Sequence, residues 1–394
     1  MSVTTYHRLS NRVRVLVIDD SALMRKLIPQ VLSADPAIEV VGTAMDGAFG
    51  LKKIAELKPD VVTLDLEMPR MDGIEMLRAA LGKYRVPVII VSSQTEENAR
   101  TALKALSLGA FDFVSKPSDS ASGHIDAIGA ELALKIKVAA SAGAPKMIVS
   151  APTETIRNLK TYTSRRAPSR VVAIGISTGG PAALQYLLLQ LPADFPGCLL
   201  VVQHMPEGFT DMFARRLHES CALEVKEAHS GDLMLAGRVL IAPGNRHMKA
   251  RRLPQGDIVV LDDTAPVNGH RPSADVLFRS VARQIGASAM GVIMTGMGDD
   301  GVEGLGEMKG TGSFTVAQDS ESCVVDSMPR AAISRGYADR VVSLSDLASV
   351  LQAQCSSWDR VTPEHASSSP AGTTTGAHVG DGVEVEPGNR RRSS

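Results

Sequence analysis

The chain has 394 residues and a net charge of −1, since 42 lysine and arginine residues face 43 aspartate and glutamate residues. This length favours two or three domains, and the balanced charge gives no electrostatic reason to expect a nucleic-acid or membrane-surface binder. The apolar runs are strand-length, which excludes insertion in a membrane, and residues 1–14 lack the apolar core of a secretion signal. We therefore expect a cytoplasmic protein in which Cys198, Cys221, Cys323 and Cys355 stay reduced, because they are far apart and form no CxxC pair.

Residues 12–128 alternate short β-branched runs with amphipathic stretches near 22–34, 48–57, 73–82 and 96–107. This alternation predicts a parallel sheet covered by helices on both faces. The predicted strands are Val13–Ile18, Val40–Met45, Val61–Leu64, Val88–Val91 and Phe111–Val114.

The rest of the chain divides into three parts. Residues 129–169 are the predicted linker, because residues 141–169 lose periodicity and become rich in Ser, Thr, Ala, Pro and basic residues. Residues 170–355 resume the strand–helix alternation and predict a second doubly wound α/β domain. Residues 356–394 contain no Leu, Ile, Phe or Met, which predicts a disordered tail. The strands predicted in the second domain are Val171–Ile176, Leu199–Val202, Val239–Ile241, Ile258–Leu261, Gly291–Met294 and Thr315–Ala317.

Polar residues follow four predicted strands of the first domain. They are Asp19, Asp20, Asp65, Ser92 and Lys116. Because ligands of an open parallel sheet bind at the carboxyl ends of its strands, we expect these side chains to share one pocket. Three carboxylates suit Mg²⁺, and the lysine and the serine suit a phosphoryl group formed on Asp65. For any one of these residues, a solvated side chain or a helix cap is the simpler interpretation, but that interpretation explains the whole set poorly.

Residues 12–128 resemble the receiver domain of two-component response regulators, through VLVIDDSALMR, VVTLDLEMPRMDG, PVIIVSS and FDFVSKP. The resemblance implies a flavodoxin-like fold and a role for each matching residue. The implied roles are phosphoacceptor for Asp65, metal binding for Asp19, Asp20, Asp65 and the backbone carbonyl of Glu67, and switching for Ser92, Phe113 and Lys116.

In the second domain, the strand ending at Ile176 runs into Ser177-Thr178-Gly179-Gly180-Pro181 and then a helical pattern. Gly175-x-Ser177-x-Gly179 has the spacing of a nucleophile elbow, in which a sharp turn exposes the serine hydroxyl at a helix N-terminus. Two alternatives compete with this interpretation. A dinucleotide-binding loop would need glycine at position 177, and a plain tight turn would need no chemistry.

A serine nucleophile needs a base and an acid that orients the base. His204 follows the next strand and would emerge beside Ser177 if the two strands are neighbours; His247 and His270 are weaker rivals in loops. The Gly-rich stretch after Gly291–Met294 supplies two adjacent acids, Asp299 and Asp300. The order serine, histidine, acid argues against an α/β-hydrolase, whose acid precedes its histidine.

Residues 170–355 resemble the catalytic domain of the chemotaxis protein-glutamate methylesterases, whose receiver-first order also matches. The matching pieces are VVAIGISTGGPAAL, VVQHMPEGFTDMFARRL, IAPGNRHM, NGHRPSADVLFRSVA, GVIMTGMGDDG and AQDSESCVVDSMPRAAI. The resemblance implies a Rossmann-like fold with Ser177 as nucleophile, His204 as general base and acid, and Asp300 as the acid that orients His204. It also implies an oxyanion hole from the backbone N–H groups of Thr178 and Met297. One departure is Asp299, where the family commonly has Asn.

The resemblance further implies an activity and partners. The substrates would be γ-glutamyl methyl esters, and certain glutamines, on chemoreceptors; a chemotaxis histidine kinase would be the phosphodonor. Mg²⁺ would serve the receiver alone, the esterase would need no cofactor, and we expect a monomer recruited to receptor arrays. From the two-domain layout we expect the unphosphorylated receiver to cover the Ser177 face until phosphorylation rearranges Ser92 and Phe113. Two rival hypotheses are a phosphorylation-dependent binding module without turnover and a hydrolase of this fold outside chemotaxis.

Overall fold

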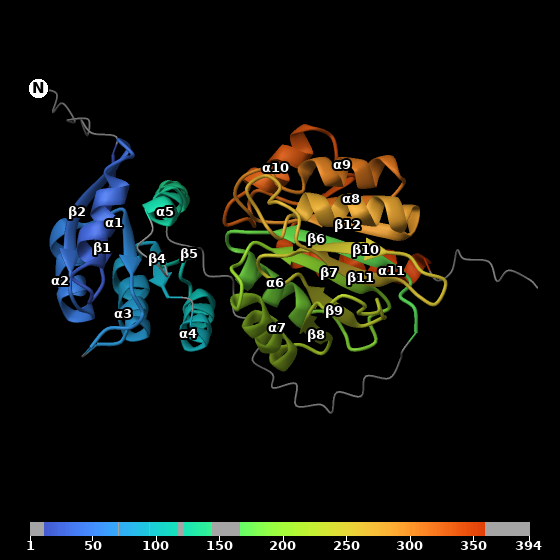
Figure 1. Ribbon diagram of the computed structural model, residues 1–394, viewed down its shortest axis with the longest axis horizontal. Coiled ribbons are helices and arrows are strands. Elements are labelled where there is room, and N and C mark those ends of the chain that lie inside the picture. Colours follow the sequence, from blue (N-terminus) through green and yellow to red (C-terminus); the bar gives the residue numbers. More distant parts are fainter. Residues whose placement is uncertain (1–11, 70, 94, 117–121, 144–165, 359–394) are drawn as a thin grey trace, which may run out of the picture.

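The computed structural model describes residues 12–69, 71–93, 95–116, 122–143 and 166–358, which form two α/β domains (Figure 1). The sheet of the first domain has five parallel strands in the order β2-β1-β3-β4-β5. Its strands are β1 (Val13–Ile18), β2 (Ile38–Ala44), β3 (Val61–Leu64), β4 (Val88–Ser92) and β5 (Asp112–Ser115). All five lie within three residues of their predicted positions.

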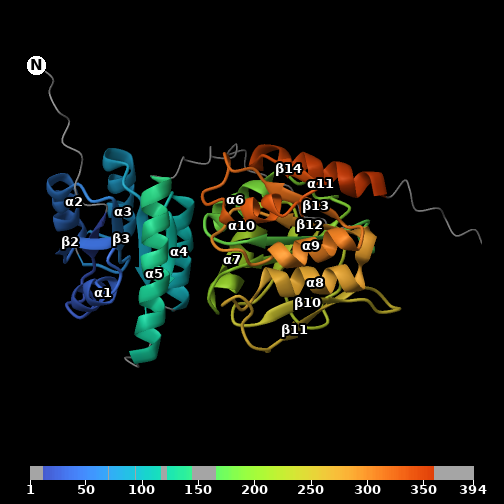
Figure 2. The ribbon, with the colours of Figure 1, turned by 90° about the horizontal axis from the view of Figure 1, so that it is seen from above.

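Helices cover both faces of this sheet because both faces of its central strands are apolar. One core cluster packs α1 (Met24–Leu32) and α5 (Ser122–Ala142) on one face. The other face carries α2 (Gly47–Leu57), α3 (Gly73–Ala79) with its π-helical extension Ala80–Tyr84, and α4 (Glu96–Ser107). In Figure 2, α4 and α5 lie on the side of this domain that faces the second domain.

The second domain is built on seven parallel strands in the order β14-β13-β12-β6-β7-β9-β8. Its strands are β6 (Val171–Ile176), β7 (Cys198–Gln203), β8 (Glu224–Glu227), β9 (Arg238–Ile241), β12 (Ala289–Ile293), β13 (Phe314–Gln318) and β14 (Arg340–Val342). The helices on one face are α6 (Gly180–Leu189), α7 (Phe209–Ser220) and α11 (Leu344–Trp358). The helices on the other face are α8 (Ala274–Gln284), α9 (Val302–Gly310) and α10 (Ser327–Ser334), and Figure 1 shows the two layers above and below the sheet.

Four parts of the sequence prediction need correction. Residues 129–142, predicted as linker, belong to α5, whose apolar residues pack against α1. Ile258–Leu261 is a strand, β11 (Ile258–Asp262), but it pairs antiparallel with β10 (His247–Arg251) in a separate hairpin. Strands β8, β10 and β14 were missed because they are short and rich in charged residues. Residues 356–358 of the predicted tail are helical, while residues 144–165 and 359–394 lie outside the described part of the chain.

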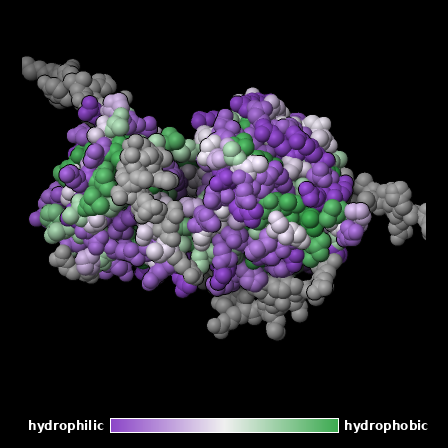
Figure 3. All heavy atoms as spheres, in the orientation of Figure 1, coloured by the Kyte–Doolittle hydropathy of each residue, from purple (hydrophilic) through white to green (hydrophobic). Residues whose placement is uncertain are grey.

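The sheet topologies fix where ligands can bind. The chain order reverses between β1 and β3 in the first sheet and between β6 and β12 in the second. At such a switch point the loops leave in opposite directions and open a crevice at the carboxyl ends of the strands. Asp19 and Asp65 follow β1 and β3, and Ser177 and Thr295 follow β6 and β12. Figure 3 shows one face of the molecule, on which hydrophilic residues cover most of both domains.

Candidate active site

Ser177 lies on the turn between β6 and α6, at the switch point of the second sheet. Its backbone N–H donates to the Thr295 carbonyl at 3.0 Å, which joins this turn to the loop after β12. Gly179 has φ 77° at the N-cap of α6, a left-handed conformation that favours glycine. Gly296 lets the loop after β12 lie close to the serine turn, because a Cβ at this position would lie 2.8 Å from the Ser177 Cβ and 2.2 Å from the Met328 Sδ.

His204 follows β7, and β7 pairs directly with β6, as the prediction required. The Ser177 Oγ and the His204 Nδ1 are 3.1 Å apart, and the His204 Nε2 and the Asp300 Oδ2 are 2.8 Å apart. Asp300 is 1% exposed, whereas the side chain of its neighbour Asp299 is 63% exposed. The structure therefore joins Ser177, His204 and Asp300 in one hydrogen-bonded chain and leaves Asp299 outside it.

The protonation state of Asp300 decides which groups donate and which accept in the hydrogen-bonded chain Ser177–His204–Asp300. Burial alone would raise the pKa of the Asp300 carboxyl, but the hydrogen bond and charge of His204, with Ser273 and Ala274, lower that pKa to about 2. An ionised carboxylate only accepts hydrogen bonds, so the Nε2 of His204 carries the proton and donates to Asp300. The Nδ1 is then free to accept from the Ser177 hydroxyl, an orientation that suits proton transfer from serine to histidine.

A single segment of the chain, residues 268–275, surrounds the carboxylate of Asp300. The Ser273 hydroxyl donates to Oδ1 at 2.6 Å and the Ala274 N–H donates to Oδ2 at 2.7 Å. The Asp275 N–H and the Asn268 amide complete the set, each 3.3 Å from Oδ1. The rival base His247 is fully buried and uses both ring nitrogens on backbone groups, donating to the Ala265 carbonyl and accepting from the Ser273 N–H.

The two backbone groups predicted for the oxyanion hole lie on the two loops that the Ser177–Thr295 hydrogen bond joins. Within the described part of the chain, neither the Thr178 N–H nor the Met297 N–H donates a hydrogen bond. Thr178 is anchored through its carbonyl, which accepts a hydrogen bond from the hydroxyl of the buried Thr295 at 3.0 Å. Both N–H groups are thus available to a ligand oxygen.

The acidic residues of the first domain also converge. Asp19, Asp20 and Asp65 can each offer a carboxylate oxygen within 4.8 Å of the others. The Lys116 Nζ lies 2.7 Å from the Asp65 Oδ2 and 2.9 Å from the Asp19 Oδ2. Burial raises the pKa of Asp65 although Lys116 lowers it. Burial alone would lower the pKa of Lys116, but the hydrogen bonds and charges of Asp65 and Asp19 together raise it. One lysine leaves two negative charges unbalanced, so this oxygen-rich set fits Mg²⁺.

Two further predicted residues of the receiver lie near this pocket. Ser92 ends β4, and its buried hydroxyl has no hydrogen-bond partner among the described residues. A buried hydroxyl without a hydrogen-bond partner lowers the stability of the fold, and a phosphoryl oxygen on Asp65 would supply the missing acceptor. Phe113, in β5, is 4% exposed because its ring is covered by the second domain. The backbone N–H of Glu67 donates to the Asp65 Oδ1 at 3.2 Å, which keeps Glu67 beside the pocket.

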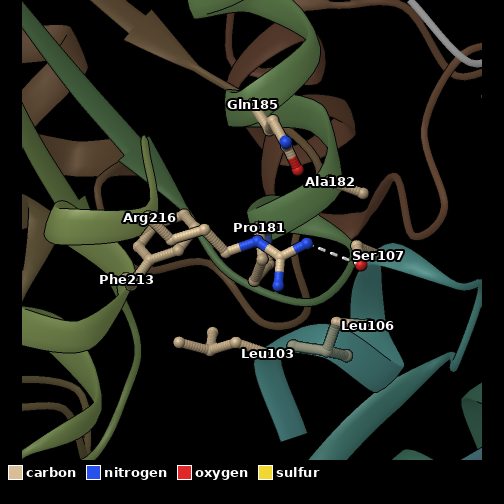
Figure 4. Close-up of a pocket in the computed structure, with 8 residues that line it drawn as sticks. All are labelled: Leu103, Leu106, Ser107, Pro181, Ala182, Gln185, Phe213 and Arg216. Carbon is tan, nitrogen blue, oxygen red and sulfur yellow. Dashed lines mark hydrogen bonds between the residues drawn. The ribbon is translucent and has the colours of Figure 1, made fainter. Parts of the chain in front are cut away.

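The two domains meet where α4 and β5 face α6 and α7, and where Val324 and Val325 pack against the core cluster of the first domain to which α5 contributes. The rings of Phe113 and Phe209 stack with centroids 4.8 Å apart and planes 9° apart. Behind Phe113, the Lys135 Nζ donates to its carbonyl at 2.7 Å and lies 5.5 Å from its ring centre. Figure 4 shows the second contact, in which Arg216 of α7 donates to the Ser107 hydroxyl of α4 at 2.7 Å. A cavity of about 10 Å³ remains beside Arg216, room for about one water molecule.

Comparisons with known proteins now identify the family. Residues 172–351 match the model of the CheB methylesterases and residues 15–125 match that of the response regulator receiver domain. A protein-glutamate methylesterase/protein-glutamine glutaminase of Koribacter versatilis is 59% identical over 348 residues, 87% of this chain and 96% of that protein. The chain belongs to the protein-glutamate methylesterase family. A relative with the same name from Syntrophotalea carbinolica is 46% identical over 86% of this chain and 97% of its own length.

Two solved structures are similar to parts of the chain. The catalytic domain of the Thermotoga maritima CheB methylesterase is 38% identical, with a TM-score of 0.46, and covers 47% of this chain and 97% of its own. The T. maritima CheB response regulator domain is 45% identical, with a TM-score of 0.31, and covers 33% of this chain and 97% of its own.

Sequence reasoning missed several residues that hold the site together. Gln203 is 2% exposed, and its amide donates to the carbonyls of Ser177 and His204, which ties the serine turn to the histidine. Thr295, Ser273 and Asn268 were not predicted either. The available signal was a polar residue directly after an apolar strand, or inside the motif NGHRPS, where burial forces a polar group to find partners.

Proposed function

We propose that this chain is a phosphorylation-activated serine hydrolase that demethylates γ-glutamyl methyl esters on methyl-accepting chemoreceptors. We further propose that it deamidates certain receptor glutamines, in keeping with the double name of its relatives. The observation that supports this most is the hydrogen-bonded chain Ser177–His204–Asp300 at the switch point of the second sheet. The glutaminase activity needs no additional site, because esters and amides react through the same tetrahedral intermediate.

In the proposed reaction, the Ser177 Oγ attacks the ester carbonyl while the His204 Nδ1 takes the hydroxyl proton. Asp300, ionised and held by four further donors, keeps the Nε2 proton in place and stabilises the imidazolium. His204 then returns the proton to the leaving methoxide, which departs as methanol. Water attacks the glutamyl-enzyme with His204 again as base, and Ser177 regains its proton when the free carboxyl leaves.

The oxyanion that forms in each step would be bound by the N–H groups of Thr178 and Met297. Two backbone donors in a water-poor site stabilise developing charge without reorganising, and losing one such donor costs about 10²–10³ in rate. For a glutamine substrate, the same steps release ammonia in place of methanol.

We assign Asp65 as the phosphoacceptor of the first domain. Asp19, Asp20, Asp65 and the Glu67 carbonyl would hold Mg²⁺, which when bound balances the negative charge of the carboxylates and the phosphoryl group. Lys116 would move from sharing two carboxylates to pairing with the phosphoryl oxygens. The orphan hydroxyl of Ser92 would donate to one of these oxygens.

We propose that the domain interface restrains the enzyme before phosphorylation. The Phe113–Phe209 stack and the Arg216–Ser107 hydrogen bond support this, because they join the receiver to α7, which begins five residues after His204. A phosphoryl group that draws Ser92 and Lys116 toward Asp65 would disturb β5 and its Phe113. The receiver would then leave the Ser177 face open to a bulky receptor helix.

The partners follow from this activity. We propose a chemotaxis histidine kinase as phosphodonor and action in the cytoplasm at receptor arrays, where the methylated helices are found. Among the described residues, no helix is long and apolar enough to cross a membrane.

The test measures methanol released from a methylated chemoreceptor cytoplasmic fragment. Wild type and Ser177→Ala are compared with and without a small phosphodonor and Mg²⁺. Ser334→Ala, which removes an exposed hydroxyl at the end of α10, is the matched control. We expect release that rises with phosphodonor in wild type and in the control and is absent in Ser177→Ala.

Two results would contradict the proposal. No release in any arm, with phosphorylation of Asp65 verified, would favour a binding module or a different ester substrate. Release that persists in Ser177→Ala would exclude Ser177 as the nucleophile.

A further inference from the structure

His270 lies directly on the face of His204. The two imidazole rings stack with centroids 3.8 Å apart and planes 6° apart. Among the described residues, neither ring nitrogen of His270 forms a hydrogen bond, and the recorded contact of the ring is its stack on His204. His270 therefore contacts His204 through the flat face of its ring and not through its nitrogen atoms.

The backbone holds His270 in this position. Val267 and His270 exchange both backbone hydrogen bonds, at 3.0 and 2.9 Å, across the two residues Asn268 and Gly269. These two residues have φ 52° and 77°, as in the tight Asn-Gly turn of a β-hairpin. The Asn268 amide is anchored to Asp275 at 2.8 Å and to Asp300 at 3.3 Å. The segment that surrounds Asp300 thus also fixes the ring that covers His204.

The charge state of His270 is compatible with a passive role. Burial lowers its pKa to about 4, and the nearby charge of His204 acts in the same direction. Asp300 and Glu131 raise this pKa and Lys135 lowers it, but they do not reverse the effect of burial. His270 is therefore neutral near pH 7 and does not compete with His204 for the serine proton.

We infer that His270 is a positioning residue for the reaction, whose ring fixes the plane of the His204 imidazole so that Nδ1 faces Ser177 while Nε2 faces Asp300. Hydrogen bonds at the two ring nitrogens still let the His204 ring tilt about the line that joins them, and a flat neighbour at van der Waals distance removes this freedom. The neutral ring face also attracts the imidazolium that forms when His204 takes the proton. This inference rests on the proposed role of His204 as the base.

The test compares His270→Ala with His270→Phe, which keeps a flat ring and removes both nitrogens. His229→Ala is the control, since that side chain is 73% exposed. The first readout is the rate at which a fluorophosphonate probe labels Ser177 in the full-length protein with phosphodonor and Mg²⁺ present, which needs no receptor substrate and measures the site in its open state. The second is kcat and KM for methanol release from the methylated receptor fragment, and thermal unfolding checks that each variant is folded.

A ring contact of this kind changes a rate that depends on it by a factor of roughly 2 to 13. We expect His270→Ala to lower both the labelling rate and kcat about tenfold, with KM unchanged, and His270→Phe to restore most of the loss. Labelling of His270→Ala at the wild-type rate would overturn the inference. A His270→Phe variant as slow as His270→Ala would also overturn it, because the nitrogens and not the ring plane would then matter. Wild-type protein that leaves Ser177 unlabelled would refute the proposed nucleophile itself, and with it the role of His270.

Discussion

Replacing Arg216 with alanine should loosen the proposed closed state without touching either active site. Arg216 lies on α7 and donates across the interface to the Ser107 hydroxyl at 2.7 Å. The bond is charge-assisted but solvent-exposed, so we take about 1 kcal/mol for its loss, below the roughly 1.5–3 kcal/mol of hydrogen bonds to charged groups because water screens it. A change of about 1 kcal/mol multiplies the open fraction about fivefold while the closed state dominates.

The assay is methanol release from the methylated receptor fragment, measured without phosphodonor. Arg216→Ala should raise this basal rate about fivefold and narrow the ratio of rates with and without phosphodonor. Arg215→Ala is the matched control, because Arg215 is the neighbouring residue and pairs with Asp211 of its own helix. Ser107→Ala should have a similar effect, and combining it with Arg216→Ala should add little, since both changes remove the same bond.

The result that would refute this reasoning is a basal rate in Arg216→Ala equal to that of the Arg215→Ala control. If a receiver-deleted fragment were then faster than the full chain, restraint would still exist but would not depend on this hydrogen bond.

Three other changes test the two sites. Gly296→Ala should lower kcat about 100-fold or more, because its Cβ would lie within 2.8 Å of Ser177 and 2.2 Å of Met328, and steady-state kinetics with thermal unfolding would separate misplacement from unfolding. Asp65→Asn should abolish the rise in methanol release with phosphodonor, and a rise that persists would exclude Asp65 as the phosphoacceptor. Asp300→Asn should lower kcat about 10⁴-fold, since the carboxylate that fixes the His204 tautomer is lost. The pKa of Asp300 is depressed to about 2, so its negative charge stabilises the folded state above about pH 4, and this contribution is lost as the pH falls from about 4 to 2. The unfolding free energies of wild type and Asp300→Asn should therefore converge in acid.

Most of the fold could be predicted because apolar alternation in parallel sheets is strong. The central strands β1, β3 and β6 begin and end where the sequence predicts, since both of their faces are buried and their residues are β-branched. The edge strands β8 and β14 were missed because partly exposed, charged residues carry no such pattern. Strand β11 was recognised but assigned to the wrong sheet, since periodicity does not specify a pairing partner.

The site was predictable where one residue follows one strand. Ser177, His204 and Asp300 each come after a buried strand, and neighbouring strands bring such residues together. The stacking of His270 on His204 could not be predicted, because it depends on a hairpin turn that lies far from both strands in the sequence. The sequence likewise offers no physical reason to prefer Asp300 to Asp299. That reason is structural, because the Asp300 carboxylate is buried against His204 and the Asp299 carboxylate is exposed.

Two interface contacts limit the free energy by which they alone can favour the closed state of the enzyme. The Phe113–Phe209 stack is worth about 0.5–1.5 kcal/mol beyond its buried area, and the Arg216–Ser107 bond about 1 kcal/mol. Together they hold the closed state by about 2 kcal/mol, which corresponds to a factor of about 30 in the open fraction. Driving the equilibrium from 1:99 to 99:1 would need about 5.5 kcal/mol. If phosphodonor raises methanol release by much more than 30-fold, then opening must also release apolar packing between the domains, such as that around the cavity lined by Leu103 and Leu106 of α4 and Phe213 of α7. Leu106→Ala should then raise the basal rate of methanol release more than Arg216→Ala does.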